Sequence, residues 1–189
     1  MMTRWKPDAA GRLAKAALEL FVEQGYEATT VAEIAERAGL TKRTFFRHFT
    51  DKREVLFAGT GELESRWLAG IEAAAPDAGP LEAVCGGFDS ISEMFAERHA
   101  FARVRSTIVE GNPDVKEREL IKMHRLTAEI EDALVQRGTP ANSAKLAAQA
   151  GVTVFHVAFG RWLQQEDAEA LRPLLDDSLN ELRSVLAVG

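Results

Sequence analysis

The sequence predicts an all-α protein in which a three-helix head precedes a larger helical domain. Three observations carry this prediction. Ala, Leu, Glu and Arg dominate the 189 residues, whereas Val, Ile and Thr are too scattered to form recognisable strands. Apolar residues recur at helical spacing in about nine successive segments. Gly and Pro stand between these segments, where helices end and turns begin.

The first expected helix covers residues 7–24. Pro7 suits its first turn, because the amide hydrogen that proline lacks would have no partner there. Gly25 allows the left-handed conformation that ends many helices. The buried stripe between them is Leu13, Ala17, Leu20 and Phe21.

Two short helices joined by a tight turn follow in residues 29–53. Thr30 and Glu33 form a capping box, in which hydroxyl and carboxylate satisfy amide groups at the start of the first short helix. Gly39 favours a turn after it, and Thr41 can cap the next helix. The apolar face of the first short helix is Val31, Ile34, Ala35 and Ala38.

The second short helix, residues 42–49, has the pattern of a DNA recognition helix. Phe45 and Phe49 stand four residues apart and are expected to face inward. The side chains left for a partner are Lys42, Arg43, Thr44, Phe46, Arg47 and His48. Together with the preceding helix this predicts a helix-turn-helix, whose second helix lies in the major groove of DNA. The alternative is a purely structural head, which the projecting cations disfavour.

The charge of the whole chain, −6, hides an uneven distribution. Residues 1–53 carry ten Lys and Arg against seven Asp and Glu, whereas residues 54–189 carry thirteen against twenty-two. Phosphate binding depends on local positive potential, so an acidic body does not exclude a DNA-binding head.

A larger helical domain is expected after the head. Asp51 and Glu54 resemble the capping residues of a helix reaching residue 75. Gly59 and Gly61 inside it indicate close packing or a slight bend, with a functional hinge as the alternative. Since no linker is visible, we place the boundary directly after the head, giving a DNA-binding domain at 1–50 and an effector-binding and dimerisation domain at 51–189. The later helices are expected at 81–98, 100–110, 114–137, 143–165 and 171–188.

The N-terminal pattern resembles the tetracycline-repressor (TetR) family over about 36 residues. Matching positions at the family's spacing are Phe21, Gly25, Tyr26, Thr29, Thr30, Val31, Ile34, Ala35, Ala38, Gly39, Leu40, Thr41, Thr44, Phe45, Phe46, His48, Phe49, Lys52 and Leu56. The resemblance implies a homodimeric, ligand-responsive transcriptional regulator, usually a repressor, that binds a palindromic operator in double-stranded DNA. Where the family often has Tyr, this chain has Phe46, which cannot donate a hydrogen bond to phosphate.

The resemblance also implies roles for individual residues of the head. Thr30, Thr41, Lys42, His48 and Lys52 are expected to contact phosphate. Arg43 and Thr44 are expected at base edges, because Arg fits the acceptors of guanine. Arg47 can serve either purpose. Arg4 and Lys6 are candidates for an arm that reaches the minor groove or backbone; the alternative is an untethered cationic terminus.

The body offers two sets of candidates, each with a plain structural alternative. An effector pocket is implied by the resemblance, and its candidate lining is Trp67, Phe88, Met94, Phe95, Phe101, Met123, Phe155 and Phe159. Such residues at helical spacing equally describe an ordinary core. The candidate dimer interface is Ala147, Gly151, Val154, Ala158, Trp162, Leu175, Leu179, Leu182 and Leu186, with the core of a monomer as the alternative.

No pattern supports catalysis, a metal site or a cofactor. Three histidines (His99, His124 and His156) lie on different expected helices without ligand spacing, and Cys85 is the single cysteine, in an apolar stripe. No uninterrupted apolar run of membrane-spanning length occurs, and MMTRWKPDAAGR lacks a signal-peptide core, so we expect a cytoplasmic protein. The sequence therefore predicts a dimeric, sequence-specific DNA-binding regulator, a repressor released by an unknown effector. The alternative is a ligand-binding or protein-docking dimer whose head does not read DNA.

Overall fold

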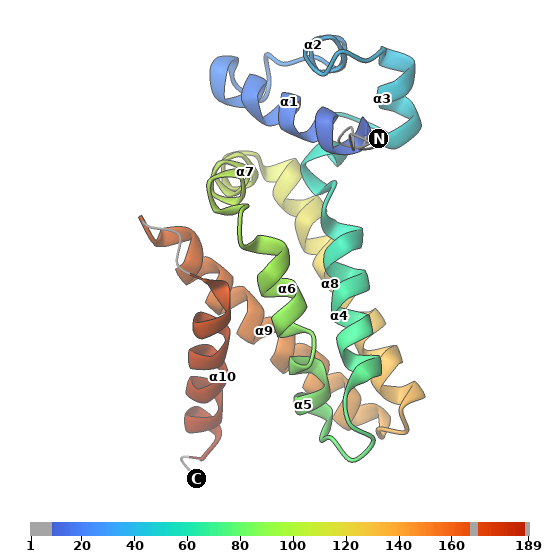
Figure 1. Ribbon diagram of the computed structural model, residues 1–189, viewed down its shortest axis with the longest axis vertical. Helices are drawn as coiled ribbons and strands as arrows, with labels where there is room; N and C mark the ends of the chain where they lie inside the picture. Colours follow the sequence, from blue (N-terminus) through green and yellow to red (C-terminus); the bar gives the residue numbers. More distant parts are fainter. Residues whose placement is uncertain (1–8, 167–169, 188–189) are drawn as a thin grey trace, which may run out of the picture. The chain divides into compact units, whose positions relative to one another are not determined.

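The computed structural model describes residues 9–166 and 170–187 (Figure 1). Within these ranges the chain forms ten α-helices and one 3₁₀ helix and has no strand, so the predicted all-α class is confirmed. The elements are α1 (Ala9–Gln24), α2 (Val31–Arg37), α3 (Lys42–His48), η1 (Glu54–Phe57), α4 (Thr60–Ala73), α5 (Pro80–Cys85), α6 (Phe88–Phe95), α7 (His99–Gly111), α8 (Pro113–Gln136), α9 (Ala141–Gln164) and α10 (Leu171–Ala187).

The chain packs as two compact units. The first contains the described residues up to 60 together with 103–119, and the second contains 61–102 together with the described residues from 120 onward. Helices α7 and α8 therefore contribute residues to both units. A functional boundary after residue 50 stays a prediction, whereas packing groups residues 51–60 and 103–119 with the first three helices.

The first unit is built around one apolar core to which all its helices contribute. Leu13 of α1, Ile34 of α2 and Phe45 of α3 are each fully buried in it. Helices α2 and α3 have only seven residues each. Isolated helices of that length are marginal in water, so packing on this core keeps them folded.

The single helix expected over residues 51–75 is two elements in the structure. The 3₁₀ helix η1 buries three consecutive side chains, and α4 begins only at Thr60. Neighbours in an α-helix point about 100° apart, so a regular helix cannot bury three in a row on one face. A Cβ on Gly59 or Gly61 would meet no atom within 4 Å. Close packing therefore does not explain these glycines, and Gly59 lies in the break itself.

The helix expected over residues 81–98 is also divided, at Gly86 and Gly87 into α5 and α6. The division coincides with a close approach of backbones: a Cβ on Gly70 of α4 would lie 2.3 Å from the Cα of Gly87, and one on Gly87 would lie 3.0 Å from the Cα of Trp67. Two adjacent glycines disfavour a continuous helix by about 1 kcal/mol each relative to Ala. Here they let α4 pack directly on the bend.

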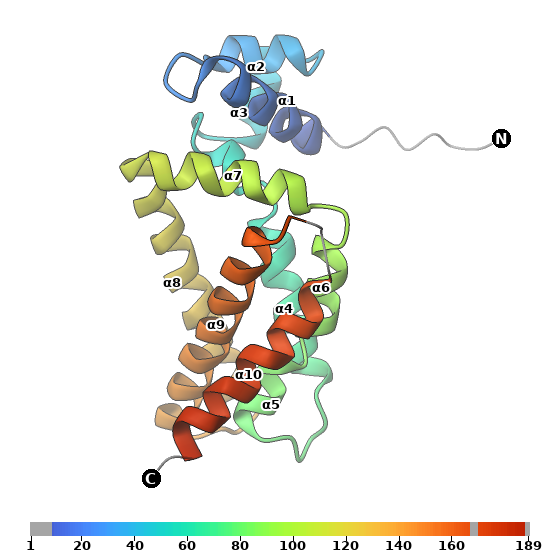
Figure 2. The same ribbon diagram turned by 90° about the vertical axis from the view of Figure 1, so that its left-hand side faces the viewer.

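The core of the second unit is contributed by α4, α5, α6, α8, α9 and α10, together with Ala102 of α7. Helix α9 passes so close to α5 that a Cβ on Gly151 would lie 2.2 Å from Val84 Cγ1. Helices α9 and α10 lie side by side (Figure 2). Among the described helices, none combines the length and the apolar character that a membrane crossing requires.

Candidate nucleic-acid interface

Local hydrogen bonds fix both ends of α2. At its start the predicted capping box is present: Thr30 Oγ1 accepts from the Glu33 amide at 3.3 Å, and Glu33 Oε2 accepts from the Thr30 amide at 2.8 Å. The hydrogen bonds from Thr30 lower the pKa of the Glu33 carboxyl, so it stays ionised at the positive end of the helix. At its end Gly39 adopts φ +64°, the left-handed conformation predicted for the turn.

Helix α3 begins at a cap and is anchored by an aromatic side chain. Thr41 Oγ1 accepts from the Thr44 amide at 3.1 Å. Phe45 is fully buried, and its ring centroid lies 5.5 Å from those of Phe46 and Phe49. Because Phe45 fixes the rotation of this short helix, the side chains opposite it are held toward solvent.

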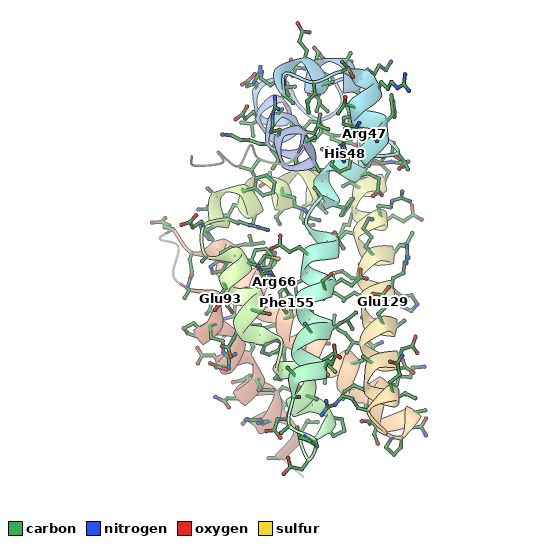
Figure 3. The ribbon with its side chains drawn as sticks, turned by 45° about the vertical axis from the view of Figure 1, so that its right-hand side comes forward. Arg47, His48, Arg66, Glu93, Glu129 and Phe155 are labelled. Atoms are coloured by element: carbon green, nitrogen blue, oxygen red, sulfur yellow. The ribbon has the colours of Figure 1, made fainter. Side chains whose placement is uncertain are left out.

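The outward face of α3 is cationic. Lys42, Arg43 and Arg47 are exposed, and none of them forms an ion pair with another described residue. Figure 3 shows Arg47 together with the exposed His48 at the end of the helix. Phe46 is 50% exposed beside them. Three positive charges without an ion-pair partner among the residues that the structure describes give this face the potential that attracts a phosphate backbone.

Two of the predicted DNA-contact residues, Thr44 and Lys52, form contacts within their own unit. Thr44 is half-buried, and its hydroxyl lies 3.0 Å from that of Thr41. Lys52 is turned into its own unit: Nζ donates to the Tyr26 carbonyl oxygen at 2.7 Å and lies 4.3 Å from the centre of the Tyr26 ring. Arg4 and Lys6 lie outside the described residues.

One residue of the head escaped the sequence reasoning. Arg12 of α1 is half-buried and donates through Nη2 to the carbonyl oxygen of Ala38, at the end of α2. In the sequence it is one more cation on an amphipathic helix, and no spacing motif marks it.

The candidate pocket residues mostly form a packed aromatic core in the second unit. Four of the eight (Trp67, Phe88, Met94 and Phe155) are buried, Phe95, Met123 and Phe159 are partly buried, and Phe101 is 40% exposed. Phe155 lies 5.3 Å from Trp67 and 5.4 Å from Phe159, ring centre to ring centre. The structure therefore brings most of this set together as mutually packed rings.

Most of the candidate interface residues are used inside one copy of the chain. Seven of the nine are buried there: Ala147, Gly151, Val154, Ala158, Trp162, Leu175 and Leu179. Leu182 is half-buried, and Leu186 is 72% exposed. Sequence could not separate these cases, because α9 carries apolar residues on more than one side. Its apolar surface that faces solvent includes Leu146 and Val157.

Two grooves in the second unit are lined by none of the predicted pocket residues, although Val154 and Leu182 in the first are candidates for the dimer interface. One, of about 710 Å³, is lined by Thr153, Val154, Val157, Arg161, Asp177, Ser178, Asn180, Glu181 and Leu182 of α9 and α10. The other, of about 530 Å³, is lined by Leu68, Ile71, Glu72, Glu129, Asp132, Ala133, Gln136 and Arg137 of α4, α8 and the turn that follows α8. Amphipathic periodicity gives no signal for such grooves, since their linings mix buried and exposed positions.

The remaining reactive side chains have structural explanations. Burial raises the pKa of the Cys85 thiol to about 11, which favours an inert thiol over a redox sensor. His99 is buried and its Nε2 lies 2.8 Å from the Trp162 carbonyl oxygen. Among the described residues no group of three or more His, Cys, Asp or Glu is placed to hold a metal ion.

Helix α3 is capped, anchored in the core and cationic on its exposed face, and it follows α2 after a tight glycine turn. These features are those of a helix-turn-helix DNA-binding protein. Comparison with known proteins agrees: the family described as "Bacterial regulatory proteins, tetR family" matches residues 13–58. The HTH-type transcriptional regulator TcmR of Streptomyces glaucescens is 30% identical over 188 residues, which cover 93% of this chain and 83% of TcmR. The chain therefore belongs to the TetR family of DNA-binding transcriptional regulators.

Further relatives and solved structures extend the comparison. The transcriptional repressor KstR2 of Mycobacterium tuberculosis is 34% identical over 95 residues, covering 48% of this chain and 46% of KstR2. FadR of Bacillus subtilis, solved in complex with stearoyl-CoA, shares the fold with a TM-score of 0.64 at 20% identity, covering 91% of this chain and 96% of that one. A TetR-family regulator from Syntrophomonas wolfei gives 0.66 at 17% identity, with 96% of both chains covered.

Proposed function

We propose that this regulator is a homodimeric repressor that binds a palindromic operator and releases it when a small molecule binds the body of the protein. The observation that carries the DNA-binding part is the exposed face of α3, where Lys42, Arg43 and Arg47 have no ion-pair partner among the described residues. The similarity to KstR2, a named repressor, supports repression. Its site of action is then the cytoplasm, where bacterial operators are found.

Within the head, we assign some residues to contacts with base edges and others to contacts with the DNA backbone. Arg43, exposed near the start of α3, is proposed to donate to guanine O6 and N7, and Phe46 to contact sugar or a thymine methyl group. The proposed phosphate contacts, which set register, are Thr30, Thr41, Lys42, Arg47 and His48, all exposed at the ends or the outer face of α2 and α3. In this proposal residues 1–50 read DNA, and residues 51–189 bind the effector and pair the two copies.

The proposed dimer uses the solvent side of α9 and α10, not the side that forms the protomer core. Val157 is 51% exposed beside the groove between these helices. On α10 the same groove is lined by the buried Ser178 and the half-buried Leu182. Across the groove Arg161 Nη2 lies 3.8 Å from Asp177 Oδ2 within one copy, and Glu181 also lines the groove. Two-fold symmetry lets Glu181 of each copy approach the Arg161 of the other.

The proposed effector is a mostly apolar small molecule. Bacillus subtilis FadR, which has the same fold, was solved with stearoyl-CoA. In this chain Phe95, Phe155 and Phe159 pack on one another, with ring centres 5.0 to 6.4 Å apart. A ligand that enters must separate these rings and therefore favours a different packing of the second unit. If that packing holds the two recognition helices at the wrong spacing, ligand binding shifts the population away from DNA.

Selection from random duplexes, combined with measurement of the oligomeric state, tests the proposal. We expect enrichment of a palindrome whose half-site centres lie about 34–36 Å apart, one helical turn of DNA or a multiple of it. A dimeric mass in solution and a ligand-induced loss of operator binding complete the expectation. If no duplex is enriched at low ionic strength and the protein is monomeric, the proposal is wrong, and a protein-docking head becomes the better account.

A further inference from the structure

We propose that His99 is a recognition residue of the effector site: its Nδ1 atom accepts a hydrogen bond from a hydroxyl or N–H group of the ligand. The inference rests on the proposed function, since it concerns the small molecule that acts on the body of the protein. It goes further by naming the chemistry of that molecule. The effector is then an apolar, ring-bearing compound that carries at least one hydrogen-bond donor.

His99 is a polar side chain at the edge of an aromatic cluster. It is the first residue of α7 and only 7% exposed. Its ring centre lies 4.7 Å from that of Trp162, with an angle of 74° between the ring planes. Trp162 in turn packs on Phe95 and Phe159, with ring centres 5.6 and 5.4 Å away. His99 therefore stands one ring away from two of the phenylalanines that an entering ligand separates.

One of the two imidazole nitrogens is already used. Nε2 of His99 lies 2.8 Å from the Trp162 carbonyl oxygen. A carbonyl oxygen only accepts, so Nε2 carries the hydrogen and donates it. In the neutral ring the other nitrogen, Nδ1, then has a lone pair and is an acceptor. The bond to Trp162 therefore fixes the tautomer as well as the orientation of the ring.

The second nitrogen has no partner in the described part of the chain. Among these residues nothing hydrogen-bonds Nδ1 of His99, and no carboxylate pairs with its ring. The buried Thr127 of the same unit differs, because its hydroxyl donates to the Met123 carbonyl oxygen at 2.9 Å. Buried polar groups nearly always have a hydrogen-bond partner, so an acceptor without one needs an explanation. A donor on a ligand beside the ring cluster supplies it.

The neighbouring rings favour an aromatic ligand. Phe155 and Phe159 are stacked, with centres 5.4 Å apart and planes 22° apart, and Phe95 lies 5.0 Å from Phe159. A planar ring that enters among them replaces the ring contacts that the phenylalanines lose. An apolar group opposite Nδ1 leaves that nitrogen without a bond, which disfavours an unsubstituted acyl chain. An ionised carboxylate is disfavoured as well, because it only accepts.

Three probes with one ring system separate donor recognition from ring stacking. Naphthalene has no polar group, 2-methoxynaphthalene has an acceptor only, and 2-naphthol has a donor. Binding to the full-length protein is measured by equilibrium dialysis. We expect 2-naphthol to bind about tenfold more tightly than either of the others, the difference that one hydrogen bond supplies. Equal affinity for the three probes, or binding of none, overturns the inference.

Two substitutions separate recognition from a purely structural role. In His99→Gln the amide extends as far as Nε2, so it still donates to the Trp162 carbonyl but places nothing at Nδ1. In His99→Asn the amide occupies the position of Nδ1, so it offers an acceptor there but does not reach Trp162. We expect His99→Gln to lose the tenfold preference and His99→Asn to keep part of it. His124→Gln, at an exposed histidine of α8, is the matched control and should keep the full preference.

The opposite pattern, in which His99→Gln keeps the preference and His99→Asn loses it, overturns the proposal, because it leaves His99 only the support of Trp162. Thermal unfolding shows whether each variant is folded; if neither is, the wild-type comparison of the three probes decides. Failure of the proposed function is a separate outcome. If all probes bind equally and release a selected operator, ligand-released repression stands and the His99 contact fails. If 2-naphthol binds with the expected preference and never releases DNA, the contact stands and the release fails.

Discussion

The solvent-facing sides of α3 and α9 differ in the chemical type of their exposed side chains. Helix α3 has seven residues, one buried anchor at Phe45 and a cationic face whose lysine and arginines form no ion pair with another described residue. Helix α9 has twenty-four residues and nine buried positions, and its exposed apolar residues continue the character of its buried side. In α3 the buried anchor is aromatic and the exposed face is cationic, so the sequence distinguishes the two sides. In α9 apolar residues lie on both sides, so only the packed structure shows which of them are buried in the protomer.

Trp162→Ala should have the largest effect and tests whether this residue belongs to the protomer. Trp162 is 1% exposed and packs against Phe95, Phe159 and His99. Truncating a buried aromatic residue lowers the free energy of unfolding by about 3–5 kcal/mol. Urea unfolding should show this loss at every protein concentration.

Val157→Glu is the matched control, on the exposed side of the same helix. It should raise the dimer dissociation constant at least tenfold, in sedimentation or light scattering, with little change in protomer secondary structure. An unchanged dissociation constant would show that the dimer interface does not include the exposed side of α9 at Val157.

Gly70→Ala should destabilise by about 1–3 kcal/mol, because the added carbon would overlap the backbone at Gly87, 2.3 Å away. Gly61→Ala, in the same helix and with no atom within 4 Å, should be neutral or raise stability by up to about 1 kcal/mol. Thermal unfolding of both variants measures the difference. Equal effects would mean that α4 does not depend on close backbone approach.

Arg43→Ala should weaken specific DNA binding by about 1–3 kcal/mol and relax sequence preference at the position it reads. The physical reason is the loss of a bidentate donor to a base, which a phosphate contact cannot replace. Repeated duplex selection with the variant checks the result. Unchanged preference at every position would remove Arg43 from the reading of bases.

The smallest expected effect concerns Glu129 on α8, labelled in Figure 3. Burial and a hydrogen bond with Glu64 raise the pKa of its carboxyl, and Asp132 acts in the same direction against Arg125. Because the folded-state pKa lies above the unfolded one, this group contributes stability that is fully present below the unfolded pKa and is lost as pH rises through the folded pKa.

Glu129→Gln keeps the shape of the side chain without the charge. It should flatten the decline of stability with rising pH, followed as the midpoint of urea unfolding across the weakly acidic to neutral range. An identical pH profile in the wild type and the variant would show that the pKa of the Glu129 carboxyl is not raised in the folded protein.

The head shows how far local signals reach. The capping box at Thr30 and Glu33, the left-handed Gly39 and the buried Phe45 all follow from spacing, because each depends on neighbours within a few residues. Lys52 shows where that reasoning ends. Its side chain donates to the Tyr26 carbonyl, twenty-six residues away in sequence, which no spacing pattern indicates, and its phosphate contact stays a prediction.

The body shows the same limit on a larger scale. The division of the helix at Gly86 and Gly87 was not predicted, since its cause is the approach of Gly70 from another helix. Equally, Trp162 and Leu175 were candidates for a surface between two copies and are buried within one.

By itself the sequence determined the helical class, the helix-turn-helix and the cationic face of its second helix. These depend on hydrogen bonds and side-chain periodicity over a few turns of chain. The tertiary structure alone decided which apolar residues fill the protomer, where glycines allow helices to touch, and which cations are engaged by distant carbonyl oxygens. Such outcomes depend on groups far apart in sequence, whose meeting no local pattern records.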